Sequence, residues 1–155
     1  RLVRLFATAM SVAGMSGSTV PGGSTAPVAL KPFEGNPVTS DPVRYARTAA
    51  YAEADARLGL GAPTIGWLRE ALGVTARLAH PLYTRGIRQP MLMIAAARDP
   101  LIDTPRVEAF ARRMKTGSAV VIPGSRHEPL QERDEIRAQF WAAFDAFVPG
   151  EQAFL

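Results

Sequence analysis

Two side chains that could carry out acid–base chemistry each follow a strongly apolar run of the sequence. Asp99 closely follows the run MLMIAAA, and His127 closely follows the run SAVVIPG. Such runs are typical of buried parallel strands, whose functional side chains gather beyond their carboxyl ends. An aspartate and a histidine there can approach within hydrogen-bonding distance, so that the carboxylate fixes the imidazole tautomer and stabilises the imidazolium. Their order also suits the last two members of a Ser…Asp…His chain order.

Each of these residues also has a purely structural interpretation. Asp99 precedes a proline and could be only a turn former, and His127 could be an incidental surface histidine. Asp103 competes for the role of the acid, but its place just before a helix start favours capping. His80 lies between an apolar helix and a proline, where we expect a structural role.

A nucleophile for this pair is not evident in the sequence. A strained nucleophile elbow needs the pattern G-x-S-x-G between a strand and a helix. The nearest match is GMSGS at residues 14–18, which has Ser18 where the second glycine belongs and no strand-like run before it. We therefore reject Ser16 as a nucleophile.

The acidic residues after His127 do not indicate a metal site. Glu128 and Glu132 could form weak ion pairs with Arg133 or Arg137, and we expect them on a solvated helix face. The segment HEPL lacks the second histidine of a zinc-binding helix. We expect no metal and no cofactor.

The composition fits one core of ordinary size. The 155 residues are 47% hydrophobic and include no cysteine, which excludes disulfides and thiolate metal sites. The net charge of +4 comes from arginines that are scattered along the chain, and no nucleic-acid-binding motif is present. We therefore expect no nucleic-acid partner.

The first half of the chain predicts loops and helices. The opening RLVRLFATAMSVAGM could be a secretory signal or an amphipathic helix. Residues 17–43 are rich in Gly, Pro, Ser and Thr, as in loops. A helix should then begin at Pro42, with Ser40 or Asp41 as its cap, and a second should begin after Thr64.

The second half alternates strands and helices. Between the two apolar runs, Thr104 is the predicted cap of a helix with Pro105 in its first position. A last amphipathic helix should follow His127, on the spacing of its apolar residues. The order strand, helix, strand, helix predicts a parallel sheet. Two strands are too few for such a sheet, so we expect further strands before residue 1, or half a domain.

Several segments resemble the α/β-hydrolase family, in its bacterial lysophospholipase and monoacylglycerol-lipase-like group. The matching segments of the presumed core are PMLMIAAARDPLID, IPGSRHEPLQERDEIR and FWAAFDAF. NPVTSDPVRY and PTIGWLREA resemble the cap region of the lysophospholipase branch. The resemblance covers nearly the whole chain.

The resemblance implies a fold, a domain division and two site residues. The fold class is α/β, the C-terminal part of an α/β-hydrolase, with residues 1–85 as a helical cap and residues 86–155 as the last part of the core. Asp99 matches the acid and His127 the base of the family's triad. In that family the elbow serine and the oxyanion-hole loop precede the cap, so we expect this chain to be a piece of a longer reading frame. The opening segment then becomes a cap helix rather than a signal.

The implied function is hydrolysis of a carboxylic ester, with lysophospholipid or monoacylglycerol-like substrates. Trp67 and neighbouring apolar side chains would line an acyl-chain site or only pack the cap. Two alternatives stay open, a relative with an aspartate nucleophile, as in dehalogenases and epoxide hydrolases, and a non-catalytic binding protein of the same fold. The expected partner is a small lipid-like ester, and the expected location is cytoplasmic, compatible with transient contact with membrane lipid.

Overall fold

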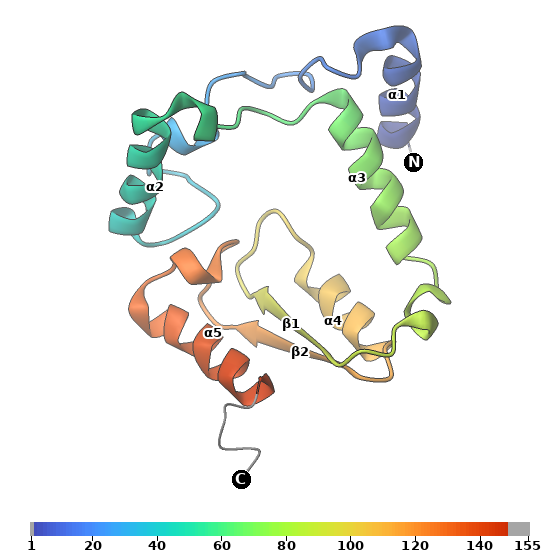
Figure 1. Cartoon of the computed structure of the whole chain (residues 1–155), viewed down its shortest axis with the longest axis vertical. Helices are drawn as coiled ribbons and strands as arrows, with labels where there is room; N and C mark the ends of the chain where they lie inside the picture. Colours follow the sequence, from blue (N-terminus) through green and yellow to red (C-terminus); the bar gives the residue numbers. More distant parts are fainter. Residues whose placement is uncertain (1, 149–155) are drawn as a thin grey trace. The chain divides into compact units, whose positions relative to one another are not determined.

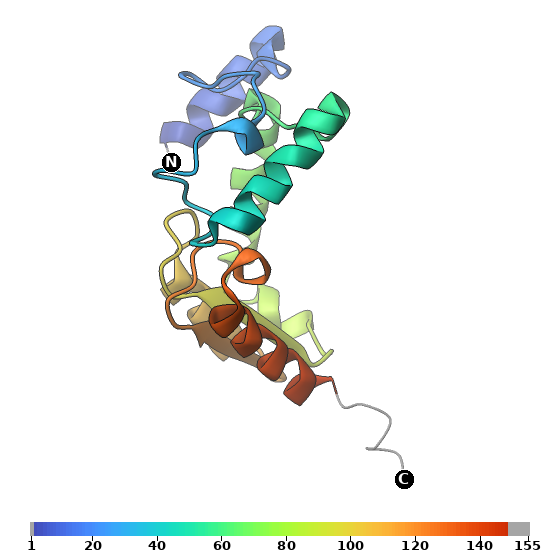
Figure 2. The same ribbon diagram turned by 90° about the vertical axis from the view of Figure 1, so that its left-hand side faces the viewer.

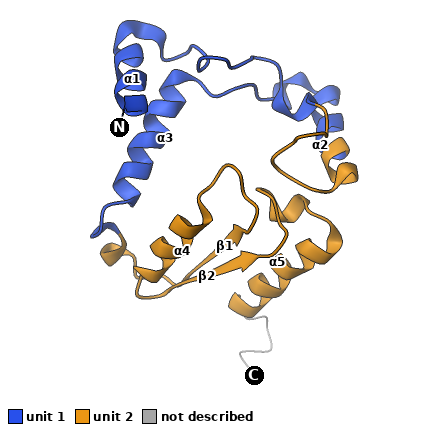
Figure 3. Cartoon of the chain, turned by 180° about the vertical axis from the view of Figure 1, so that it is seen from behind, with its two compact units in different colours: residues 1–31, 47–83 blue, residues 32–46, 84–155 orange. Residues whose placement is uncertain are grey.

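The chain forms two compact units. The computed structural model describes residues 2–148. Unit 1 comprises residues 1–31 and 47–83, and unit 2 comprises residues 32–46 and 84–155 (Figure 3). Residues 32–46 thus group with the C-terminal part of the chain, and one boundary falls inside a helix. The expected division into a cap of residues 1–85 and a core of residues 86–155 stays a prediction.

Unit 1 is helical. Helix α1 lies alongside α3 and contacts it (Figure 1). Ala7 of α1 and Ile65 of α3 are almost fully buried. Thr64 caps α3 as predicted, because its hydroxyl accepts a hydrogen bond from the backbone N–H of Trp67 at 3.1 Å. The helical segments that lie wholly or partly in unit 1 are α1 (Leu2–Met10), a π-helical turn (Ser11–Met15), α2 (Pro42–Ala54), α3 (Ile65–Leu78) and 3-10 turns at Val28–Leu30, Ala56–Leu58 and Tyr83–Gly86.

Helix α2 begins in unit 2 and continues into unit 1. Asp41 is its cap, since one carboxylate oxygen accepts from the N–H groups of Val43 and Arg44 at 2.8 and 3.0 Å. Of the two predicted caps, Asp41 therefore performs this role, and Ser40 has a different partner.

Unit 2 contains the sheet. The strands β1 and β2 are parallel, with Met91 opposite Gly117 and Ala96 opposite Ile122, which confirms the predicted parallel pairing. Figures 1 and 2 show the two strands between α4 and α5, and both helices contact both strands. After the turn Tyr83–Gly86, the elements of unit 2 are, in chain order, β1 (Met91–Ala96), α4 (Thr104–Arg112), β2 (Gly117–Ile122), a 3-10 turn (Pro129–Gln131) and α5 (Asp134–Phe147).

The structure confirms the predicted capping role of Asp103 at the start of α4 but not that of Thr104. Asp103 is the cap, with a carboxylate oxygen 3.3 Å from the backbone nitrogen of Arg106, and Thr104 is the first helical residue. The Thr104 hydroxyl instead donates to the carbonyl oxygen of Ala96 at 2.7 Å. The prediction of Thr104 as the cap was wrong because the helix begins one residue earlier, with Asp103 as its cap, and the Thr104 hydroxyl joins the helix start to the end of β1.

None of the described helices is long and apolar enough to cross a membrane.

Two glycines predict opposite effects of added methyl groups. A Cβ at Gly117 would lie 2.7 Å from Cβ of Met114 and 2.9 Å from the carbonyl oxygen of Ala111, whereas a Cβ at Gly73 in α3 meets no atom within 4 Å. We expect Gly117→Ala to lower the free energy of unfolding of the full-length protein by about 1–3 kcal/mol through overpacking. Gly73→Ala should raise it by about 0.5–1 kcal/mol, because alanine loses less backbone entropy in a helix. Urea unfolding of both variants measures this, and equal effects would contradict the packing at the start of β2.

Candidate active site

Asp99 and His127 are hydrogen-bonded to each other in unit 2. The Nδ1 atom of His127 lies 2.9 Å from Oδ2 and 3.1 Å from Oδ1 of Asp99. The contact fits an Nδ1–H group that donates to the carboxylate. The Asp99 side chain is only 7% exposed, whereas that of His127 is 32% exposed. The structure therefore brings together the two residues that the sequence singled out, with the acid buried behind the base.

The loops that carry this pair are joined by an extension of the parallel pairing. Beyond the last paired residues, the N–H of Ala97 donates to the carbonyl of Ile122 at 3.1 Å, and the N–H of Arg98 donates to that of Ser125 at 2.9 Å. Gly124 makes the turn between them with a φ of +77°, a conformation that favours glycine. These contacts place Asp99, which follows Arg98, beside His127, the second residue after Ser125.

The Asp99 carboxylate is held by its own loop as well as by the histidine. Its Oδ1 atom accepts from the backbone N–H groups of Leu101 and Ile102 at 2.8 and 3.0 Å. Burial raises the pKa of the Asp99 carboxyl, but the hydrogen bonds with His127 and the two amides outweigh it, and the pKa lies below its ordinary value. Asp99 is therefore an ionised acceptor of fixed orientation, as an acid that orients an imidazole must be.

The second ring nitrogen of His127 is available for proton transfer. In the described part of the chain, no group hydrogen-bonds to Nε2 of His127. A ring whose Nδ1–H is bound to a carboxylate carries its lone pair on Nε2. The arrangement can therefore accept a proton at Nε2 and stabilise the resulting imidazolium through Asp99.

The other residues considered for a catalytic role have structural contacts of their own. Asp103 caps α4 and forms an ion pair with Arg106 at 2.8 Å. The Nδ1 atom of His80 accepts from the N–H of Leu82 at 3.3 Å, as a local turn contact. Ser16 is exposed, and its carbonyl oxygen accepts from the N–H of Gly66 at 2.9 Å, so the GMSGS segment contacts the first turn of α3. Asp103 has no hydrogen bond to His127, and His80 and Ser16 belong to unit 1.

The prediction for Glu132 was wrong. We expected it on a solvated helix face, yet it is fully buried. Helix α5 begins only at Asp134, so Glu132 lies in the preceding loop and not on a helix face. Its carboxylate accepts from the N–H of Arg126 and from both the N–H and the hydroxyl of Ser40. No sequence pattern indicates a partner this distant along the chain.

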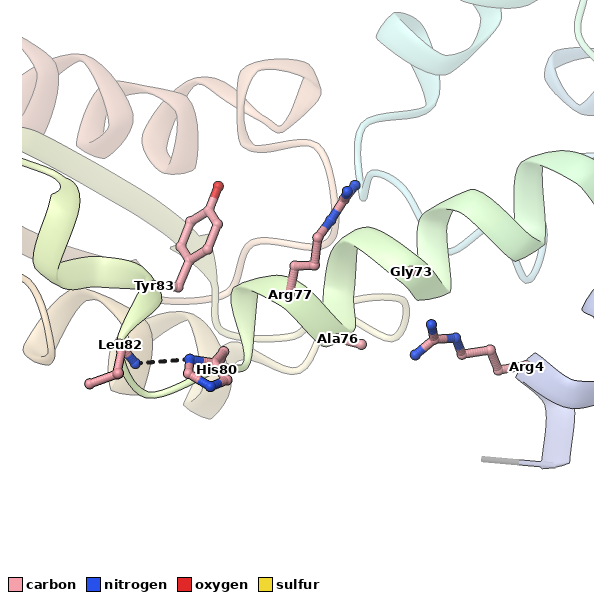
Figure 4. Close-up of a pocket in the computed structure, with 7 residues that line it drawn as sticks. All are labelled: Arg4, Gly73, Ala76, Arg77, His80, Leu82 and Tyr83. Atoms are coloured by element: carbon pink, nitrogen blue, oxygen red, sulfur yellow. Dashed lines mark hydrogen bonds between the residues drawn. The ribbon is translucent and has the colours of Figure 1, made fainter.

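Unit 1 contains an open pocket, and neither Asp99 nor His127 lines it. The side chains of Arg4 and Arg77 extend to different sides of α3 (Figure 4), so they do not converge on one point. The only hydrogen bond drawn within it is the contact of His80 with Leu82. The lining residues are Arg4, Gly73, Ala76, Arg77, His80, Leu82 and Tyr83. Within residues 2–148, no group of three or more His, Cys, Asp or Glu side chains could hold a metal ion.

The chain is similar to known proteins in sequence and in fold. The family model Hydrolase_4, described as serine aminopeptidase, S33, matches residues 5–134. The chain is 26% identical over 91 residues to the probable lysophospholipase L2 of Haemophilus influenzae, across 59% of this chain and 28% of that protein.

A solved structure gives the same fold. It is the crystal structure of a soluble variant of the monoglyceride lipase from Saccharomyces cerevisiae in complex with a substrate analog. The TM-score is 0.67 at 13% sequence identity, across 95% of this chain and 48% of that chain. The present chain therefore spans less than half the length of either relative.

These findings confirm the resemblance inferred from the sequence, and with it the fold class as the C-terminal part of an α/β-hydrolase. The family match covers most of the chain, including both Asp99 and His127. The chain belongs to the serine aminopeptidase S33 family of α/β-hydrolases.

Proposed function

We propose that this chain supplies the acid and the base of a Ser-His-Asp triad in a carboxylic ester hydrolase. The observation that carries the proposal is the contact of 2.9 Å between Nδ1 of His127 and Oδ2 of Asp99, which leaves Nε2 of His127 without a partner among the described residues. Relatives named as a lysophospholipase and a monoglyceride lipase support the reaction class.

In this proposal the nucleophile is a serine outside the 155 residues. His127 takes the serine proton at Nε2 while the serine oxygen attacks the ester carbonyl, and Asp99 stabilises the imidazolium. Backbone amides hold the oxyanion. The imidazolium then gives its proton to the leaving alcohol, and His127 next activates a water molecule that hydrolyses the acyl-enzyme. Without the serine, turnover should fall by about 10⁶-fold, so the isolated chain should be inactive.

The substrate class in this proposal is a lipid-like ester, either a lysophospholipid or a monoacylglycerol. It is supported by the printed names of the two relatives. Residues 1–85 would form the cap, and Trp67, which is exposed in unit 1, is a candidate for contact with the acyl chain. Such substrates reside in lipid surfaces, so a cytoplasmic enzyme of this kind would contact membrane lipid transiently.

A substrate panel tests this proposal. The full-length protein is assayed with a lysophospholipid, a monoacylglycerol, a p-nitrophenyl ester and an aminoacyl peptide, with and without a serine-directed fluorophosphonate. We expect hydrolysis of at least one lipid ester and of the p-nitrophenyl ester, and loss of both after fluorophosphonate labelling. Cleavage of the peptide without cleavage of any ester would contradict the proposal, as would ester hydrolysis by protein whose serine is fully labelled.

A further inference from the structure

A buried carboxylate lies next to the backbone of the candidate base. The side chain of Glu132 is fully buried. Its Oε1 atom accepts from the N–H of Arg126, the residue before His127, at 2.8 Å. Its Oε2 atom accepts from the N–H of Ser40 at 3.0 Å and from the Ser40 hydroxyl at 2.5 Å. One carboxylate thus joins the His127 loop to residues far earlier in the chain.

The backbone is held on both sides of His127. On one side, the N–H of Arg126 donates to Glu132. On the other, the N–H of Glu128 donates to the carbonyl of Val38 at 2.9 Å. These two bonds restrain the backbone on either side of His127. Both acceptors belong to unit 2, and neither belongs to the strand that precedes the histidine.

Residues 36–40, which include Val38 and Ser40, are held in place by further hydrogen bonds within the segment and to residues near His127. The Oδ1 atom of Asn36 accepts from the N–H groups of Val38 and Thr39, both at 3.0 Å. The Thr39 hydroxyl donates to the carbonyl of Gln131 at 2.6 Å. The Arg126 guanidinium donates to the carbonyls of Asn36 and Thr39 at 2.9 and 3.0 Å. The segment therefore is a rigid support against which the His127 loop is held.

The carboxylate of Glu132 is stabilised in its ionised form. Burial raises the pKa of Glu132, but hydrogen bonds from Ser40, from the amide of Arg126 and from a further amide outweigh it, and the pKa lies below its ordinary value. A buried charge is costly unless every lone pair finds a donor. The two oxygens of this one carboxylate accept from two backbone segments, one beside His127 and one at Ser40.

We propose that Glu132 is a positioning residue for His127, which it aligns with Asp99 by holding the backbone N–H of Arg126 and by tying it to Ser40. The inference rests on the proposed function, in which His127 is the general base. Glu132 does not touch the reacting atoms. Its effect comes from the placement of Nε2 of His127, and a displacement of about 1 Å in a reacting group can lower the rate by about 100-fold.

Three substitutions in the full-length protein test the inference by steady-state kinetics on the p-nitrophenyl ester. Glu132→Gln keeps the size but has one acceptor oxygen, and Glu132→Asp keeps the charge but is too short to reach both partners. We expect both to lower kcat by about 10- to 100-fold with KM nearly unchanged. The matched control is Glu135→Gln in the exposed first turn of α5, which should leave kcat unchanged. Wild-type kcat in Glu132→Asp together with a loss in Glu132→Gln would assign the effect to charge and overturn the inference.

A second readout does not depend on turnover. In the wild-type protein, the Nδ1–H proton of His127 should give a hydrogen-bonded imidazole signal in proton NMR. We expect this signal to shift or broaden in both Glu132 variants and to be retained in Glu135→Gln. An unchanged signal in both Glu132 variants overturns the inference. If His127→Ala retains full activity, the proposed function fails, while the ring signal still decides whether Glu132 positions the histidine.

A milder variant covers the case in which Glu132→Gln fails to fold. Ser40→Ala removes only the hydroxyl donor and leaves both backbone N–H groups on the carboxylate. We expect a loss of kcat in the same direction but within about tenfold, with a correspondingly smaller change in the ring signal. A Ser40→Ala protein with wild-type kcat and a wild-type ring signal would overturn the inference.

Discussion

His127→Ala should lower kcat of the full-length protein on a carboxylic ester by about 10⁴- to 10⁶-fold, with the thermal melting temperature little changed. The variant lacks the nitrogen that would accept the serine proton, and in the described residues no other titratable group lies at Nε2 of His127. The side chain is 32% exposed, so its removal leaves no large buried cavity. Initial rates with the p-nitrophenyl ester and a melting curve measure the two effects.

The other histidine of the chain is the matched control. His80 lies in unit 1 and makes only a local contact with the N–H of Leu82. His80→Ala should therefore retain nearly full activity. If His127→Ala kept its activity within tenfold of wild type, or if His80→Ala lost as much as His127→Ala, the assignment of the base would be wrong.

Asp99→Asn should lower kcat by about 10⁴-fold, because the amide can donate to Nδ1 of His127 and so favours the tautomer with its proton on Nε2. The isosteric change keeps an oxygen for the N–H groups of Leu101 and Ile102, so the loop should stay folded. Kinetics with the same ester measure the loss. The effect should be smaller than that of His127→Ala, since the base itself is still present.

The control for this variant is the neighbouring carboxylate. Asp103 caps α4 and is paired with Arg106, with no contact to His127. Asp103→Asn should retain most of the activity, because asparagine is also a good helix cap. Loss of activity in Asp103→Asn together with an active Asp99→Asn would show that the other carboxylate is the acid.

The sequence predicted the parts of the site that local patterns control. The apolar runs that became β1 and β2 fix a parallel pair, and the carboxyl ends of parallel strands meet at one edge. Asp99 and His127 were found because each follows one of these runs. The cap at Thr64 was likewise predicted, since the side chain and the backbone N–H that donates to it lie within one helical turn.

The parts that were missed depend on contacts across long stretches of chain. Glu132 was placed on a solvated face because its partner Ser40 lies 92 residues earlier, and no periodicity relates the two. The contact of the Thr104 hydroxyl with the carbonyl of Ala96 was also missed, because this carbonyl is brought near the helix start only when the strand is formed. In both cases the partner of a polar side chain was set by tertiary structure rather than by a local pattern.

The hydrogen bonds that hold the His127 loop also have a consequence for the order of folding. The hydrogen bond between His127 and Asp99 closes a loop of 28 residues, whereas the bonds from Ser40 to Glu132 close one of 92. Closure entropy increases with loop length, and contacts of high sequence separation slow folding. In refolding, the shorter loop should therefore close before the longer one. The acid–base pair can form first, and it becomes rigid only when residues 36–40 have bound the His127 loop.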